Sequence, residues 1–177
     1  LDNLSRIDYG FSFLNKSNKD VSNVKSFQVG QSYQIDNNKY LNKNSGINRK
    51  FSDIAGNMDF APIPELSVTS YFTIDKENFS LKTAYSSLLL RQRNSILSVS
   101  NNHYAPVIDN NGKSIIDGKN QFSLRYDQRF YDFWNFTAYT TFDKKNKLKL
   151  FNYGTKIKYE DECFGVSLAW TRQFTHN

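Results

Sequence analysis

The sequence predicts an all-β fold, in which about ten antiparallel strands form an up-and-down meander within a larger transmembrane β-barrel. Apolar and polar residues alternate with a period of two in one segment after another. Aromatic content is 16%, with 11 Tyr and 15 Phe, although the mean hydropathy is only -0.64. This combination is typical of a barrel whose apolar outer face carries aromatic girdles while its lumen and loops stay polar.

Eight segments carry the alternation clearly. They are residues 6–13, 26–35, 66–74, 79–86, 122–130, 134–142, 156–159 and 164–171. Successive side chains of a strand point to opposite faces, so each segment has one apolar and one polar face. In the fourth segment the pattern puts Tyr85 on the apolar face and Lys82 on the polar face. Two weaker segments, 53–60 and 95–103, complete a set of ten strands.

The lengths of the connections predict which end of each strand faces the cell exterior. The two longest, 36–50 and 104–119, are both even-numbered and therefore emerge on the same side of a meander. Outer-membrane barrels place long loops outside and short turns in the periplasm. The remaining assignments are 75–78 and 143–147 outside, and 62–64, 91–94 and 160–162 in the periplasm.

Two local irregularities are expected as well. Asn111-Gly112 and Asp117-Gly118 are turn dipeptides within the connection 104–119. They predict a small extra hairpin with strands at 107–108 and 115–116. A change of phase between Leu150 and Phe151 predicts a β-bulge there.

The charge pattern limits the classes of partner. The net charge is +6, which could reflect nucleic acid, anionic lipid or a phosphorylated glycolipid as partner. Lys and Arg are scattered with no dense run, so nucleic acid is not expected. Charged residues at inward positions fit either a water-filled lumen or a lumen that accommodates an anionic head group. These residues are Arg6, Asp8, Asp53, Asp59, Lys82, Arg125, Asp127, Arg129, Lys156 and Lys158.

Few residues suggest reactive chemistry. Cys163, which the connection count puts on the periplasmic side, is either an ordinary free thiol or the partner of a cysteine elsewhere. His103 and His176 do not have metal-ligand spacing with cysteines or carboxylates. No nucleophile elbow, P-loop or dinucleotide motif occurs. We therefore expect no enzyme, no catalytic residues, no metal and no cofactor.

Several short motifs, in this order and on a barrel pattern, are similar to one known family. They are Asn3–Gly10, Val29–Tyr33, Ser52–Gly56, the turn with Pro62 and Pro64, and Tyr159–Phe164 followed by Arg172–Phe174. Together they span most of the chain. The chain resembles the C-terminal barrel of LptD, the lipopolysaccharide-assembly protein of the outer membrane, also called organic solvent tolerance protein.

The resemblance implies function, partners and a disulfide. Members of this family form a large outer-membrane barrel of Gram-negative bacteria, plugged by the lipoprotein LptE. The barrel receives lipopolysaccharide from a periplasmic LptA-like bridge through an N-terminal domain and inserts it into the outer leaflet. Cys163 matches the late cysteine that bonds to one near the family's N-terminus. Arg125, Arg129, Lys156 and Lys158 are the expected lumen contacts for the lipid head group or the plug.

The resemblance also implies that residues 1–177 are the C-terminal part of the barrel domain. We expect the periplasmic domain to lie upstream, since residues 1–15 lack a signal peptide. A closing strand is expected beyond Asn177. Two alternatives stay open: a general porin or receptor barrel, and a soluble β-sandwich adhesin with its aromatic faces packed between two sheets.

Overall fold

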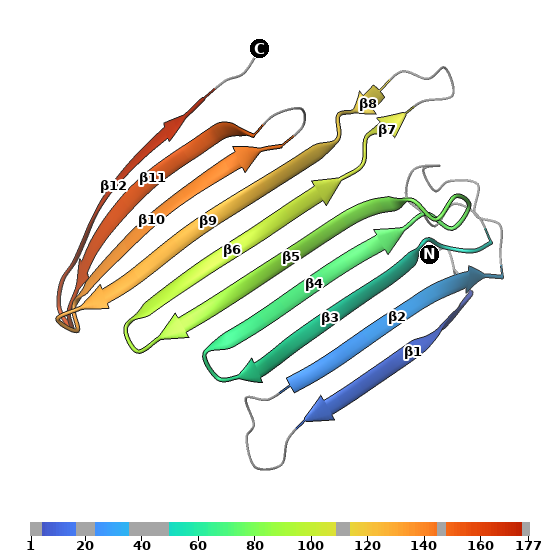
Figure 1. Cartoon of the computed structure of the whole chain (residues 1–177), viewed down its shortest axis with the longest axis horizontal. Helices are drawn as coiled ribbons and strands as arrows, with labels where there is room; N and C mark the ends of the chain where they lie inside the picture. The colour runs from blue at the N-terminus through green and yellow to red at the C-terminus, as the bar shows by residue number, and fades with distance from the viewer. Residues whose placement is uncertain (1–4, 17–23, 36–49, 109–113, 145–147, 175–177) are drawn as a thin grey trace.

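The computed structural model contains strands and no helix in the residues it describes, which are 5–16, 24–35, 50–108, 114–144 and 148–174. The strands, drawn in Figure 1, are β1 (Arg6–Lys16), β2 (Val24–Gln34), β3 (Ile54–Ile63), β4 (Leu66–Ile74), β5 (Leu81–Gln92), β6 (Ser95–Tyr104), β7 (Val107–Ile108), β8 (Ser114–Ile116), β9 (Lys119–Phe130), β10 (Trp134–Asp143), β11 (Lys149–Glu160) and β12 (Gly165–Gln173). Nothing in the described part of the chain offers a helical membrane span.

Ten strands form one antiparallel sheet in the order β1-β2-β3-β4-β5-β6-β9-β10-β11-β12. Each of these ten strands pairs with the next of them along the chain, which confirms the predicted meander (Figure 1). The extra hairpin is also confirmed, because β7 pairs with β8 between β6 and β9. It stands apart from the main sheet.

Three bulges modify the register of the main sheet. Thr141 pairs with Asn152 and Phe142 with Leu150, so Phe151 is an extra residue, which confirms the predicted bulge. A second bulge lies between Phe60 and Ile63. It contains Pro62, which has no N–H to donate to a ladder.

The third bulge corrects one prediction about the faces. Thr73 pairs with Thr83 while Ile74 pairs with Leu81, so Lys82 is the extra residue. The extra residue reverses the alternation for the rest of β5. Tyr85 consequently pairs with Tyr71 and Asn102 on the polar face, and the expectation of an apolar-facing Tyr85 is wrong. Periodicity alone could not locate the bulge, since Leu81, Lys82 and Thr83 fit either phase.

The apolar face is uncovered. No hydrophobic side chain among the described residues is buried, and Phe11, Leu168 and Trp170 are 60%, 71% and 53% exposed. A β-sandwich would bury such side chains between two layers. The described main strands instead form one sheet, so the sandwich alternative is wrong, and the apolar face is suited to contact lipid.

Aromatic side chains gather near both ends of this apolar face. Trp134 lies 6.5 Å from Phe130 and 5.1 Å from Tyr159, measured between ring centroids. Near the opposite end Tyr153 lies 5.2 Å from Trp170 and 5.9 Å from Phe174. The strand between Tyr159 and Tyr153 is roughly 20 Å long. Membrane barrels likewise carry aromatic girdles at both edges of their apolar band.

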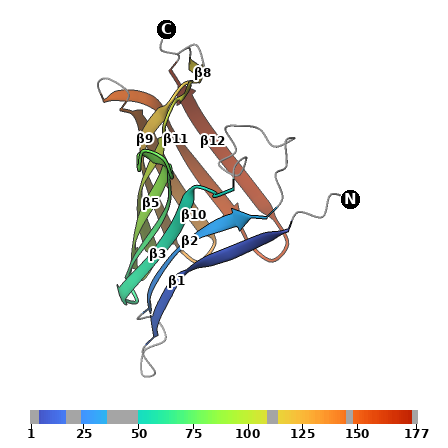
Figure 2. The same ribbon diagram turned by 90° about the vertical axis from the view of Figure 1, so that its right-hand side faces the viewer.

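The sheet is curved and open. Figure 2 shows it bent into a trough whose two edges are β1 and β12. A hollow of about 640 Å³ lies over β2 to β5 and is lined mainly by polar-face residues, among them Gln28, Asn57, Tyr71 and Thr73. The polar face is therefore the concave face, as in a barrel wall with a polar lumen.

The two ends of the trough differ in their connections (Figure 1). At the long-loop rim β2, β4, β6 and β10 end and β3, β5, β9 and β11 begin, whereas at the short-turn rim β1, β3, β5, β9 and β11 end and β2, β4, β6, β10 and β12 begin. This division agrees with the grouping expected from the sequence. The predicted turn 91–94 is shorter in the structure, because Arg91 belongs to β5.

Candidate functional site on the concave face

Pairing between neighbouring strands arranges the concave face in rows, because directly paired residues point to the same side. One row near the short-turn rim contains Arg91, Asp127 and Lys156 on alternate strands, with Ile96 and Thr137 between them. Alternate strands are roughly 10 Å apart. The row therefore presents a cation, an anion and a cation in turn across β5 to β11.

Arg129 and Lys158 lie one row closer to the same rim. Both pair with Asn135 of β10, so they flank it on β9 and β11. Arg125 lies one row further from the rim and pairs with Tyr139. All four cations selected from the sequence thus lie on the concave face, close to one end of the trough.

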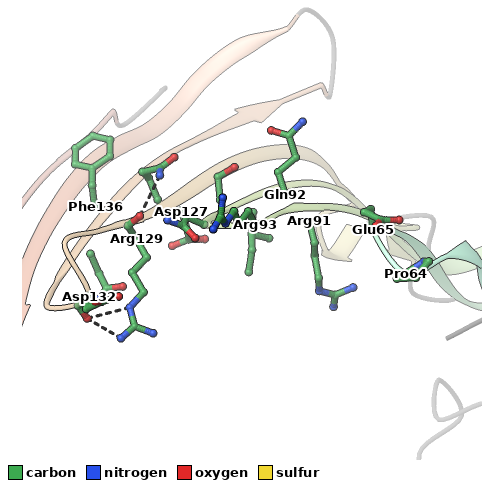
Figure 3. A pocket seen from close by; sticks show the side chains of 14 residues that line it. Pro64, Glu65, Arg91, Gln92, Arg93, Asp127, Arg129, Asp132 and Phe136 are labelled. Atoms are coloured by element: carbon green, nitrogen blue, oxygen red, sulfur yellow. Dashed lines mark hydrogen bonds between the residues drawn. The ribbon is translucent and has the colours of Figure 1, made fainter. Parts of the chain in front are cut away.

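A hollow of about 620 Å³ lies at this rim between the turns of β5–β6 and β9–β10. Arg91, Arg93 and Arg129 line it together with Glu65 and Asp127. In Figure 3 the ribbon arches over the side chains of Arg91 and Arg129, whereas Phe136 points away on the other side. Cationic and anionic side chains both line this hollow, and an anionic ligand in it would contact arginines from two separate hairpins.

Arg125 is paired within the sheet. Its Nε and Nη2 donate to the two carboxylate oxygens of Asp127 at 2.7 and 2.8 Å. Thr137 donates a further hydrogen bond to Asp127 Oδ1 at 2.6 Å. Because the guanidinium fork is already occupied, Arg125 is less available to an incoming anion than its position alone suggests.

Arg129 holds a turn. Its Nε and Nη2 donate to the backbone carbonyl of Asp132 at 3.0 and 2.6 Å. Tyr131 and Asp132 have φ values of 50° and 52°, a left-handed conformation that residues other than glycine rarely adopt. The arginine stabilises this turn, and it also lines the hollow.

The two lysines differ in their environment. Lys158 Nζ lies 2.5 Å from Glu160 Oε2 and forms a surface ion pair. Lys156 is exposed and has no ion-pair or hydrogen-bond partner within the described ranges. Lys156 is therefore the cation of the four whose charge is most available.

Arg91 is a further cation of this site, although the sequence pattern predicts it in the turn 91–94. It is exposed on the concave face, and its Nη1 donates to Ser67 Oγ at 3.3 Å. To place Arg91 on the concave face one must know which residues of β5 point to that face, and only the bulge at Lys82 establishes this.

The long-loop rim carries a different charged cluster. Lys82 Nζ lies 2.7 Å from Asp53 Oδ2 and 2.9 Å from Asp75 Oδ2. Asp75 also accepts hydrogen bonds from the backbone N–H groups of Glu77 and Asn78 in the β4–β5 turn. The hydrogen bond from Lys82 is the main cause that lowers the pKa of the Asp75 carboxyl. This cluster links three segments of the chain, and because both aspartates pair with Lys82, its ammonium group is not available to a ligand.

Cys163 lies exposed in the β11–β12 turn at the short-turn rim. Asp161 shapes this turn, because its Oδ1 accepts the N–H groups of Cys163 and Phe164 at 2.9 and 2.8 Å. Its Oδ2 accepts the Tyr159 hydroxyl at 2.7 Å. The bond from Tyr159, followed by these two backbone bonds, lowers the pKa of the Asp161 carboxyl. The turn therefore presents the thiol from a well-defined backbone.

No group of three or more metal-ligating side chains exists in the described portion of the chain. His103 pairs with Ala84 and Asn120 on the apolar face, remote from the charged rows. His176 lies outside the described residues.

The family model for LptD, described as LPS transport system D, matches residues 3–134. The matched segment runs from the start of β1 to the first residue of β10 and includes Arg125 and Arg129, whereas Lys156, Lys158 and Cys163 lie beyond it. No curated protein sequence matches the chain.

Proposed function

The chain belongs to the LptD family of lipopolysaccharide transport proteins, and we propose that it forms part of an outer-membrane barrel wall that inserts lipopolysaccharide into the outer leaflet. The observation that carries this proposal is the curved sheet with a polar concave face and a fully uncovered apolar face. Such a wall satisfies its backbone hydrogen bonds in lipid only when the sheet closes. We therefore propose that further strands pair with β1 and β12, and that residues 1–177 are the C-terminal part of the barrel domain.

The proposed mechanism is physical and involves no catalysis. A lipopolysaccharide molecule has a charged, hydrophilic head and apolar acyl chains. The concave face offers the head group water and hydrogen-bonding side chains, and the bilayer takes the acyl chains. The periplasmic LptA-like bridge and an LptE-like plug would be the partners on either side of this step.

Lys156 is the strongest candidate for a head-group contact in the proposed lumen. Its ammonium group is unpaired among the described residues, whereas Arg125, Arg129 and Lys158 already have partners. A phosphate on the head group would gain a charge-assisted interaction from Lys156 without breaking an existing ion pair. Arg125, Arg129 and Lys158 would contact the head group by exchanging their present partners for it, or they would contact the plug.

Site-specific photocrosslinking tests the proposal. A photoreactive residue at position 156 should form an adduct with lipopolysaccharide in the intact outer membrane. The same residue at position 157 is the matched control, because Ile157 is the next residue of β11 and points to the apolar face. Charge reversal at Arg125 and Arg129 should weaken the adduct. Failure to obtain any lipopolysaccharide adduct at 156 would contradict a role of this wall in transport.

We also propose that Cys163 forms a disulfide with a cysteine outside residues 1–177. The thiol is exposed at the short-turn rim, which the family's topology would place in the periplasm, where disulfides form. Full-length protein should therefore run differently on a gel with and without reductant, and Cys163→Ser should abolish the difference. A reductant-insensitive protein would favour a general porin or receptor barrel, which needs no such bridge.

A further inference from the structure

The concave face between the two rims carries a second surface that is not charged. One row crosses six neighbouring strands from β2 to β9 and contains only amide and tyrosine side chains: Gln28, Asn57, Tyr71, Tyr85, Asn102 and Gln121. We name these six residues the neutral belt. The adjacent row toward the short-turn rim is rich in hydroxyl groups, including Ser87, Ser100 and Ser123.

The belt is continuous and accessible. Neighbouring positions are roughly 5 Å apart, which is close to the length of one sugar unit in an extended saccharide. The rings of Tyr71 and Tyr85 stack with centroids 6.2 Å apart and planes 26° apart. Tyr71 is 52% exposed, so a face of this pair is open to the trough. Three belt residues, Gln28, Asn57 and Tyr71, line the same hollow over the concave face, together with Thr73.

The polar atoms of the belt are unoccupied. None of the six side chains forms a side-chain hydrogen bond within the described parts of the chain, whereas neighbouring polar residues do. Thr73 bonds Thr83 at 2.6 Å, and Ser123 bonds Thr141 at 3.1 Å. Each free amide can donate and accept, so the row offers both kinds of hydrogen bond to a ligand.

This chemistry selects one class of ligand. A phosphate would favour the cations at the short-turn rim, and an acyl chain would leave the amides without partners. Sugars present many hydroxyl groups, which amides can bond in either direction, and apolar C–H faces, which can pack on exposed aromatic rings. The bulge at Lys82 is what brings Tyr85 into this row and completes the aromatic pair.

We propose that the neutral belt binds an uncharged saccharide chain. This inference rests on the proposed transport function and deepens it. In a transported lipopolysaccharide the belt would contact neutral sugars, while the phosphorylated part would stay at the cations of the short-turn rim. The structure thus assigns two parts of one substrate to two surfaces of the wall.

The test uses full-length protein in cells that make lipopolysaccharide with a long neutral saccharide chain, and in cells whose lipopolysaccharide lacks that chain. A photoreactive residue is placed at 102 in the belt, at 101 as the matched apolar-face control, and at 156 at the rim. We expect an adduct at 102 that falls about tenfold with the truncated lipid, through loss of two or more hydrogen bonds. The adduct at 156 should form with both lipids, and position 101 should give no chain-dependent adduct.

Other results would overturn the inference. An equal yield of adduct at position 102 with both lipids would show that the belt does not bind the neutral saccharide chain. An adduct at 102 with polypeptide alone would assign the belt to the plug. Absence of lipopolysaccharide adducts at both 102 and 156 would instead contradict the proposed function itself.

A second measurement separates the sugar chemistry from substrate delivery. With purified full-length protein, a neutral dextran should reduce the yield of the lipopolysaccharide adduct at position 102. Inorganic phosphate should leave that yield unchanged. Tyr71→Ala should weaken dextran competition about fivefold, through loss of an aromatic packing face. Tyr126→Ala is the matched control, because Tyr126 faces the apolar side. Equal effects of the two variants, or competition by phosphate alone, would refute saccharide binding by the belt.

Discussion

The two rims of the trough use their charges differently. At the long-loop rim Lys82 lies between Asp53 and Asp75, and the cluster ties β5 to the segments next to β3 and β4. At the short-turn rim Lys156 has no partner among the described residues, and the Arg91 side chain donates to the uncharged hydroxyl of Ser67. The first arrangement stabilises the fold, and the second leaves cations accessible to a ligand. Position on the concave face alone does not distinguish them, whereas the contacts of each cation do.

Removing one lysine from each rim should give the largest difference in stability between the two rims. Lys82→Ala leaves two partly buried aspartates without their shared cation, so the free energy of unfolding should fall by about 1.5 kcal/mol. Lys156→Ala should change it by less than about 0.5 kcal/mol, because the side chain is exposed and unpaired. Urea titration of the folded barrel in detergent measures both. Equal losses would show that the rims do not differ as described.

Acid should weaken the long-loop rim selectively. The pKa of Asp75 is lowered from its usual 3.8 in the folded state, so its contribution to stability is present above pH 3.8. That contribution is lost as the pH falls through the lower folded-state pKa. The stability difference between wild type and Asp75→Asn should therefore be largest at neutral pH and shrink below 3.8. The effect should be smaller than that of Lys82→Ala, because Asp53 still pairs with the lysine. A difference that is constant with pH would argue against the ion pair.

Arg125 tests whether a pair that is more exposed behaves like the cluster at the long-loop rim. Its side chain is 57% exposed, and Asp127 keeps a hydrogen bond from Thr137 when the arginine is removed. Arg125→Ala should therefore destabilise the protein by less than about 1 kcal/mol. The same urea titration applies, with Arg125→Lys as the variant that keeps the charge but loses the two-point contact. A loss as large as that of Lys82→Ala would make Arg125 a structural residue.

Arg129 both stabilises the β9–β10 turn and lines the hollow at the short-turn rim. The smallest predicted change in stability separates these two roles. Asp132→Gly should stabilise the protein by about 0.5 kcal/mol, because glycine adopts a φ near 52° without strain. In that background Arg129→Ala should cost little stability, while the lipopolysaccharide adduct at 156 should still decrease. An unchanged adduct would restrict Arg129 to the turn.

Periodicity was sufficient for most of the fold. Ten strands, their order, the extra hairpin at 107–116 and the bulge at Phe151 all followed from alternation and turn residues. These features are local, because the period of two and the turn dipeptides are properties of short segments. The location of Arg125, Arg129, Lys156 and Lys158 on one face followed for the same reason.

The sequence by itself therefore determined the class of fold, the two faces and the family's motifs. Only the tertiary structure decided which cations are engaged, since the partners of Lys82 come from the ends of two other strands. It also decided the phase of β5, on which Arg91 and the neutral belt depend. A single extra residue turns every following side chain to the other face, and which residue is extra depends on pairing with the neighbouring strand.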